Sequence, residues 1–177
     1  MICRHTHVRH GISASAAMAL LLLAASVATA DDRSIDPGAK HSWSETAGWQ
    51  NWGDANGSVT VVLDGANSYL KGYVWAERVG WIKLGAGAGS GPYANTDPTT
   101  WGVNMDGAGN LSGYAWSETT GWVNVNPSHG QVTVNLTNGE FDGYAWAEGI
   151  GWVHLRNATP TYAVAMPGLS GTVIRFR

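Results

Sequence analysis

Apolar and polar residues alternate along most of this chain, and the alternation is organised around a motif that occurs four times. The motif is W-[AS]-E-x-x-G-W, and its copies span residues 43–49, 75–81, 116–122 and 146–152. Three copies are followed by alternating residues such as Val153-His154-Leu155. Alternation with β-branched and aromatic residues is typical of strands, and E-x-x-G between two tryptophans indicates a hairpin loop. The pattern therefore predicts one hairpin unit, duplicated four times.

A further strand precedes three of the hairpins. Segments 58–63, 101–105 and 131–136 alternate in the same way. Each runs into a tight-turn signal, Asp64-Gly65, Asp106-Gly107 or Asn138-Gly139, and then into a strand that contains G-Y-x-W. A full repeat is thus a three-stranded meander. The first copy lacks its first strand, whereas segment 160–166 resembles such a strand with no hairpin after it, so we expect the C-terminal strand to complete the first repeat.

These elements predict an all-β fold in which four tryptophan-rich meander or hairpin repeats form a single closed domain. Closure removes the exposed edges of a sheet, and a sandwich, a barrel and a small propeller all achieve it. We expect the domain to span residues 41–166, after a lead-in at 31–40 and before a tail or closing strand at 167–177. The first and third copies are 73 residues apart and the second and fourth 71, whereas adjacent copies are 32, 41 and 30 apart, which favours two pairs of repeats over four equal ones.

The first 30 residues have the pattern of a secretory signal peptide. Arg4 and Arg9 precede an apolar run at 17–27, and Ala28-Thr29-Ala30 forms an A-x-A cleavage site. The apolar run is too short to span a bilayer. Cys3 is the one cysteine, so the mature chain of about 147 residues has none and relies on its hydrophobic core. We therefore expect a protein that is secreted or held at the outer cell surface, without a membrane span.

The mature chain is acidic. The formal net charge of −3 becomes about −5 once Arg4 and Arg9 leave with the signal peptide. This charge argues against nucleic acid or an anionic membrane as the partner. We expect a monomer.

The paired tryptophans have two interpretations: exposed platforms on which sugar rings stack, as in a carbohydrate-binding or adhesion module, or core residues. Because the repeat places them on one face and a cysteine-free domain must bury something large, we expect them to line the core. One glutamate recurs in each hairpin, and we expect it to accept hydrogen bonds from its own loop rather than to act in a catalytic pair. We therefore expect no enzyme. A structural surface repeat protein is a further alternative.

The histidines depart from the repeat. His154 takes a place held elsewhere by asparagine or lysine, His41 lies two residues before Trp43 where the other copies have tyrosine, and His129 lies in the loop N-P-S-H-G. Strand period two puts His41 on the face of Trp43 and His154 on the face of Trp152. If the array closes, the first and last repeats are neighbours, and His41 and His154 converge. Two or three imidazoles without thiolates or paired carboxylates suit copper or zinc better than calcium.

The motifs H-x-W-S-E-x-x-G-W, G-Y-A-W-[AS]-E-x-x-G-W and N-P-S-H-G-Q-V-T-V together resemble the surface-associated copper-binding proteins of methane-oxidising bacteria, of the MopE and CorA type. The resemblance covers residues 41–155. It implies a protein that scavenges or buffers one copper ion, mainly as Cu(I), held by two histidines and assisted by a tryptophan oxidised to kynurenine. The matching residues are His41, His129 and His154, with Trp43 and Trp152 as the flanking tryptophans. Which two histidines bind the metal stays open.

Overall fold

The computed structural model describes residues 30–87 and 89–169. These residues form sixteen β-strands and one short 3-10 turn, η1 (Gly65–Asn67), so the predicted all-β class is confirmed. Of the expected signal peptide only Ala30 is described, and residues 170–177 of the expected tail also lie outside the described residues. Within the described residues, no helix has the length and hydropathy needed to cross a membrane.

The four predicted hairpins are present, and in each of them the two tryptophans of the motif face each other. Trp43 pairs with Trp49, and the other three copies have the same register. The hairpins are β2 (His41–Ser44) with β3 (Gly48–Asn51), β6 (Tyr73–Ala76) with β7 (Gly80–Lys83), β9 (Leu111–Ser117) with β10 (Gly121–Asn124), and β13 (Tyr144–Ala147) with β14 (Gly151–His154).

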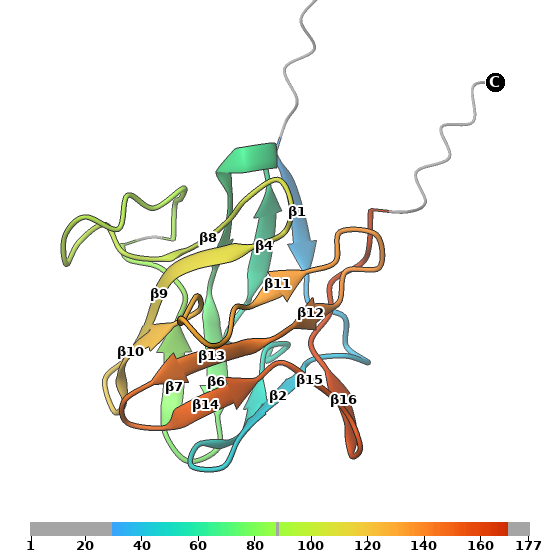
Figure 1. The fold of residues 1–177 in the computed structure, drawn as a ribbon. Coiled ribbons are helices and arrows are strands. Elements are labelled where there is room, and N and C mark those ends of the chain that lie inside the picture. Colours follow the sequence, from blue (N-terminus) through green and yellow to red (C-terminus); the bar gives the residue numbers. More distant parts are fainter. Residues whose placement is uncertain (1–29, 88, 170–177) are drawn as a thin grey trace, which may run out of the picture.

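The hairpins join side by side into a closed antiparallel barrel. Its strand order is β2-β3-β6-β7-β9-β10-β13-β14, and β14 pairs with β2 to complete the ring. Figure 1 shows the last hairpin, β13–β14, lying beside β2. The barrel is therefore the closed form that this chain adopts, and closure leaves the ring without a free edge.

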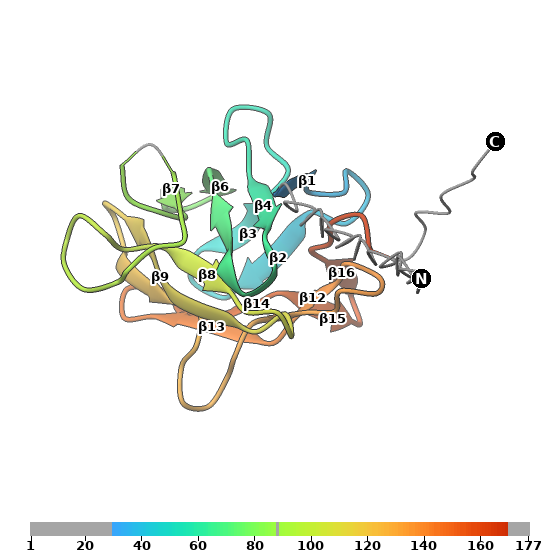
Figure 2. The same cartoon turned by 90° about the horizontal axis from the view of Figure 1, so that it is seen from above.

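Further strands lie outside the ring (Figure 2). They are β1 (Asp31–Ser34), β4 (Thr60–Leu63), β5 (Ser68–Lys71) and β8 (Val103–Met105), the pair β11 (Thr133–Val134) and β12 (Phe141–Asp142), and the pair β15 (Arg156–Ala158) and β16 (Thr161–Ala163). The predicted first strands correspond to β4, β8 and β11. The strand β1, which pairs with β4, was not predicted: its D-D-R-S sequence has no alternation.

The C-terminal strand completes the first repeat, as predicted. Val164 forms a bridge with Lys40 just before β2, and the Ala165 N–H donates to the Ala39 carbonyl at 2.7 Å. Val164 also donates to the Leu155 carbonyl at 3.1 Å, just as Val103 of the β8 strand donates to the Leu84 carbonyl at 2.9 Å. The segment after β16 thus takes the place of a first strand for the hairpin β2–β3.

A glycine bend separates the outer and inner parts of each second strand. Gly72, Gly113 and Gly143, the glycines of G-Y-x-W, have φ values of 99°, 88° and 92°. Positive φ strains residues that carry a Cβ atom, so glycine suits these bends. The bend lets one continuous segment pair first with an outer strand and then with a barrel neighbour.

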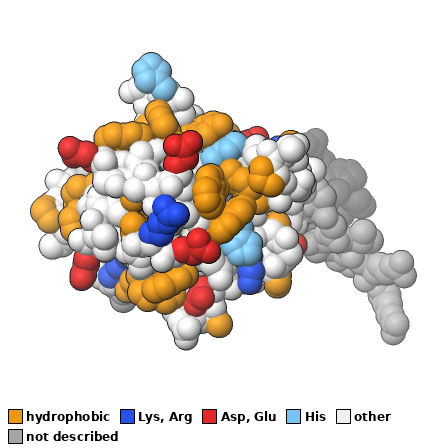
Figure 3. Space-filling model, turned by 90° about the horizontal axis from the view of Figure 1, so that it is seen from below, with side chains coloured by type: hydrophobic (Ala, Val, Ile, Leu, Met, Phe, Trp, Pro, Cys, Tyr) orange, Lys and Arg blue, Asp and Glu red, His pale blue; other side chains and the backbone are white. Residues whose placement is uncertain are grey.

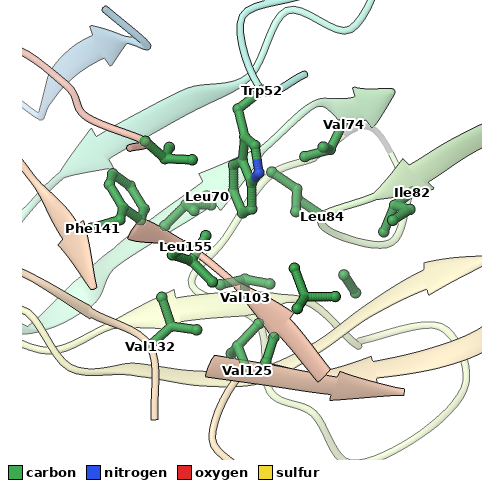
Figure 4. Packing of buried hydrophobic residues seen from close by; sticks show 14 of the residues in the cluster. Trp52, Leu70, Val74, Ile82, Leu84, Val103, Val125, Val132, Phe141 and Leu155 are labelled. Carbon is green, nitrogen blue, oxygen red and sulfur yellow. The ribbon is translucent and has the colours of Figure 1, made fainter. Parts of the chain in front are cut away.

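The core fills the barrel and the space between the ring and the outer strands (Figure 4). Within the ring the inward positions carry small or aliphatic side chains, such as Val74, Ala115 and Val153. Trp52, which lies outside the repeated motif, is 7% exposed and packs on Phe141 with ring centroids 5.9 Å apart. The larger fully buried side chains include Phe141, Leu70, Leu84, Leu111 and Leu155.

The prediction that the paired tryptophans line the core is wrong. Trp75, Trp81, Trp122, Trp146 and Trp152 are 38–44% exposed, and they lie on the outer face of the barrel. An eight-stranded barrel has an interior only just wide enough for side chains, and the residues beside the tryptophans in each strand already fill it. The indoles stack edge-to-face outside, with centroids 4.6–4.9 Å apart in three of the pairs.

Candidate functional site

The hairpins meet at four junctions around the barrel. Two of these, which we call the weak junctions, have fewer residue pairs in register than the other two, the strong junctions. The β3–β6 and β10–β13 junctions each have two residue pairs in register. The β14–β2 and β7–β9 junctions each have one, His154 with Trp43 and Lys83 with Trp116. Weak and strong junctions alternate, in agreement with the two pairs of repeats that the motif spacing favours.

His154 ends β14 and lies on the outer face at the weak junction with β2. Its ring stacks on Tyr144, with centroids 4.1 Å apart and planes 5° apart. The Tyr162 hydroxyl lies 3.2 Å from His154 Nδ1, in hydrogen-bond range. Tyr144 and Tyr162 therefore fix the orientation of the imidazole from two sides and leave Nε2 as the nitrogen for a metal ion.

His41 begins β2 on the same outer face. It takes the place of the repeat tyrosine and makes the same contact, edge-to-face with the second tryptophan of its hairpin, Trp49, at 6.1 Å. Because Trp43 is the register partner of His154, His41 is the diagonal neighbour of His154 across the two strands. Diagonal neighbours on antiparallel strands lie about 7–8 Å apart, within reach of two long side chains. The register thus places His41 and His154 at the same junction, and among the described residues no direct ring contact joins them.

Aromatic rings connect the two histidines. Trp49 packs edge-to-face on Trp43 at 4.9 Å and on Tyr162 at 5.2 Å, and Tyr162 meets His154 at 6.0 Å. A cavity of about 380 Å³ lies beside these rings, and Asn157 and Pro160 complete its wall. In Figure 3, hydrophobic side chains gather next to histidines on this side of the molecule. The junction is thus an aromatic cluster with one imidazole on each of two adjacent strands.

Burial favours the neutral form of both imidazoles. It lowers the pKa of His41 below 6.5, with a further lowering from Lys40 and an opposing effect of Glu77. It also lowers the pKa of His154, against an opposing effect of Asp142. A metal ion binds the neutral form of imidazole, so protons compete weakly with a metal here.

The lowered pKa values predict a loss of stability in acid. Below pH 6.5 the unfolded imidazoles bind protons that the folded ones resist, so the free energy of unfolding decreases as the pH falls from about 6.5 towards the lower folded pKa values. Urea unfolding of the metal-free protein at about pH 7.5 and about pH 5.5 measures this decrease. The double variant His41→Gln/His154→Gln is the control, and a decrease of unchanged size in that variant would refute the assignment to these histidines.

The other predicted site residues lie differently. His129 is exposed on the loop between β10 and β11, and among the described residues no hydrogen bond or ring contact joins it to His41 or His154. Trp43 lies directly opposite His154. Trp152 is 44% exposed and contacts Tyr144 edge-to-face at 6.1 Å, so Tyr144 lies between it and His154.

The donor set limits the kind of metal. Among the described residues, no group of three or more His, Cys, Asp or Glu side chains is arranged to hold an ion. Structural zinc sites use four protein ligands, and calcium requires six or more oxygens. A site at this junction rests on two imidazole nitrogens, which fits a low-coordinate soft ion better than either of these.

Two residues at the junction were missed by sequence reasoning. Tyr162 belongs to the segment expected to complete the first repeat, but only the fold shows that it packs on the first hairpin and reaches His154. Tyr144 was taken as a repeat residue, and its stacking on His154 follows from their register pairing. The alignment of segment 160–166 with a first strand was the one signal that pointed to Tyr162.

The repeated glutamates do not have the predicted local role. Glu77 accepts a hydrogen bond from the Trp49 N–H at 3.2 Å, in the neighbouring hairpin rather than in its own loop. In the hairpin loops it is serine that accepts: Ser44 Oγ from the Ala47 N–H at 3.3 Å and Ser117 Oγ from the Thr119 N–H at 3.3 Å. Glu77 thus stabilises the contact between two hairpins.

No protein-family model, curated protein or solved structure matches this chain. The resemblance to copper-binding surface proteins therefore rests on the motifs alone. The function has to be argued from the geometry of the β14–β2 junction and from the chemistry of its side chains.

Proposed function

We propose that this protein binds one copper ion as Cu(I), through His41 and His154 at the β14–β2 junction. The observation that supports the proposal is the placement of two partly buried imidazoles at diagonal positions of adjacent strands, within an aromatic cluster. They stand where the first and last hairpins close the barrel, so the site depends on closure. His129 has no part in it.

The surroundings of His154 suit a metal ligand. Ligating histidines commonly donate their second ring N–H to a neighbouring group, which fixes the tautomer and the ring orientation. Here Nδ1 lies 3.2 Å from the Tyr162 hydroxyl, which leaves Nε2 for the ion. Of the two tryptophans that the resemblance implies for kynurenine formation, Trp43 lies directly opposite His154, and we propose it as the third contact.

The aromatic surroundings favour Cu(I) over Zn²⁺. Zn²⁺ brings two positive charges into a cluster of rings without a coordinating carboxylate, whereas Cu(I) brings one and accepts few ligands. We therefore propose a copper scavenger or buffer, exported by the N-terminal segment to act as a monomer in the medium or at the cell surface.

A copper titration with histidine variants tests the proposal. The protein competes anaerobically with a chromophoric Cu(I) chelator, and we expect one equivalent to bind. His41→Ala and His154→Ala each lower the Cu(I) affinity by at least about 100-fold, because loss of even an outer-shell partner typically costs about 10–100-fold. Quenching of tryptophan fluorescence by the bound ion reports the same site.

His129→Ala is the matched control, because it removes the third imidazole from an exposed loop. We expect it to bind Cu(I) as tightly as the natural sequence. Tight binding that persists in the double variant His41→Ala/His154→Ala, or that is lost only in His129→Ala, would rule out this site.

A further inference from the structure

The β7–β9 junction repeats the architecture of the histidine junction without its imidazoles. It has the same single register pair, here Lys83 with Trp116, and the same edge-to-face contact of an added ring on the hairpin tryptophans, here Trp101 on Trp122 at 5.4 Å. Three residues replace those of the candidate metal site: Lys83 stands for His154, Tyr114 for His41, and Trp101 for Tyr162. The second junction thus lacks the two imidazoles but has aromatic side chains at the corresponding places.

A groove of about 780 Å³ lies at this second junction. Its size is within the range of about 300–1,000 Å³ that small-molecule sites in proteins occupy. Its apolar surface includes the rings of Tyr73 and Trp81, which are 39% and 38% exposed. Trp101 and Trp116 provide further aromatic wall. The groove therefore offers ring surfaces to a ligand at a junction with a single residue pair in register.

Polar side chains with opposite charges accompany these rings. Lys83 lies over the ring of Tyr73, 5.8 Å from its centroid, and donates to the Gly87 carbonyl at 3.0 Å. Glu118 and Asn56 also line the groove, and neither side chain has a hydrogen-bond or ion-pair partner among the described residues. The groove thus presents both hydrogen-bond donors and hydrogen-bond acceptors. The charges of Lys83 and Glu118 cancel, so these two residues give the groove no net charge.

We propose that this groove binds a neutral oligosaccharide. A pyranose ring has apolar C–H faces that pack on the electron-rich face of an aromatic ring, and its hydroxyls both donate and accept hydrogen bonds. Trp81 supplies the main ring surface, Trp101 and Trp116 extend it, and Lys83, Glu118 and Asn56 supply the polar partners. The Lys83 ammonium already covers Tyr73 and opposes a cationic ligand, while Glu118 opposes an anionic one. This site is separate from the histidines and does not depend on copper.

Titration of the full chain with cellotetraose, followed by tryptophan fluorescence and by calorimetry, tests this site. We expect saturable binding that is unchanged in His41→Ala/His154→Ala. Trp81→Ala weakens the affinity at least about tenfold, because it removes one ring surface. Glu118→Gln, an exposed change that leaves the fold intact, weakens it several-fold.

The matched control is Trp146→Ala. Trp146 is 39% exposed, against 38% for Trp81, but it lies at the β10–β13 junction and outside the groove. We expect this variant to bind cellotetraose like the natural sequence. Three outcomes would overturn the proposal: no binding of cellotetraose at millimolar concentration, equal losses in Trp81→Ala and Trp146→Ala, or saturable binding of tetramethylammonium in place of the sugar.

Discussion

Replacing Phe141 by alanine is expected to lower the free energy of unfolding by about 3–5 kcal/mol. Phe141 is fully buried on β12 and packs on Trp52 between the barrel and the outer strands. Truncation removes the transfer free energy of the ring and leaves a cavity that close-packed neighbours fill only in part. Urea unfolding monitored by circular dichroism measures the change.

The contrast with an outward tryptophan makes this prediction specific to the fold. Trp146→Ala removes a larger side chain, but one that is 39% exposed on the outer face. We expect it to cost at most about half as much as Phe141→Ala, because less area returns to water and no enclosed cavity forms. A larger loss for Trp146→Ala than for Phe141→Ala would mean that the tryptophans form the core after all.

Gly143→Ala is expected to lower the free energy of unfolding by about 3–5 kcal/mol, or to prevent folding. Gly143 has a φ of 92°, and a Cβ atom there would overlap the Gln131 carbonyl oxygen of the adjacent outer segment. The cost therefore combines left-handed strain of about 1–2 kcal/mol with displacement of the backbone. The unfolding midpoint and the yield of folded protein measure it.

Gly151→Ala separates these two contributions. Gly151 also has a positive φ, 70°, but an added Cβ atom would meet nothing within 4 Å. We expect a loss of only about 1–2 kcal/mol from backbone strain. Equal losses in Gly143→Ala and Gly151→Ala would show that the close approach at the strand bend has no energetic role.

The local elements of this fold follow from the sequence because they depend on neighbouring residues. The motif predicts the hairpins, and the turn signals Asp64-Gly65 and Asp106-Gly107 predict the links between outer strands, which the structure confirms. The choice of a barrel depends on pairing between residues far apart, such as His154 with Trp43. Such long-range register is set by the packing of the whole chain, and no local pattern contains it.

The direction in which the tryptophans point was not decided by periodicity. Strand period two separates the two faces of a strand but does not state which one faces inward. The signal lay in the alternate positions: Ser42, Ala76 and Ala115 are small and fit the interior of an eight-stranded barrel, where indoles do not. The size of the residues between the tryptophans was therefore more informative than the tryptophans.

The candidate site was predictable only in part. His41 and His154 stood out because they break the repeat, and ring closure explains why they share a junction. The contribution of Tyr162 depends on β16 packing against the first hairpin, a contact across more than a hundred residues of chain. Asymmetry within a repeat thus identified the residues, and the fold supplied their neighbours.

Each of the two weak junctions is a proposed ligand site, and the two sites are separate. One carries imidazoles and is proposed to bind copper, and the other carries Lys83 and Glu118 and is proposed to bind sugar. Aromatic rings surround both, so the outward tryptophans serve each of them as walls. A protein of this kind would hold copper while it attaches to a polysaccharide.

The central claim is that His41 and His154 bind one Cu(I) ion at the closure of the barrel. The most direct test is to follow the imidazole ¹⁵N NMR signals of the natural sequence as Cu(I) is added under anaerobic conditions. We expect the signals of His41 and His154 to change together and the change to be complete at one equivalent, whereas the His129 signals stay in place. A change confined to His129, or no change in any histidine while copper is retained, would contradict it.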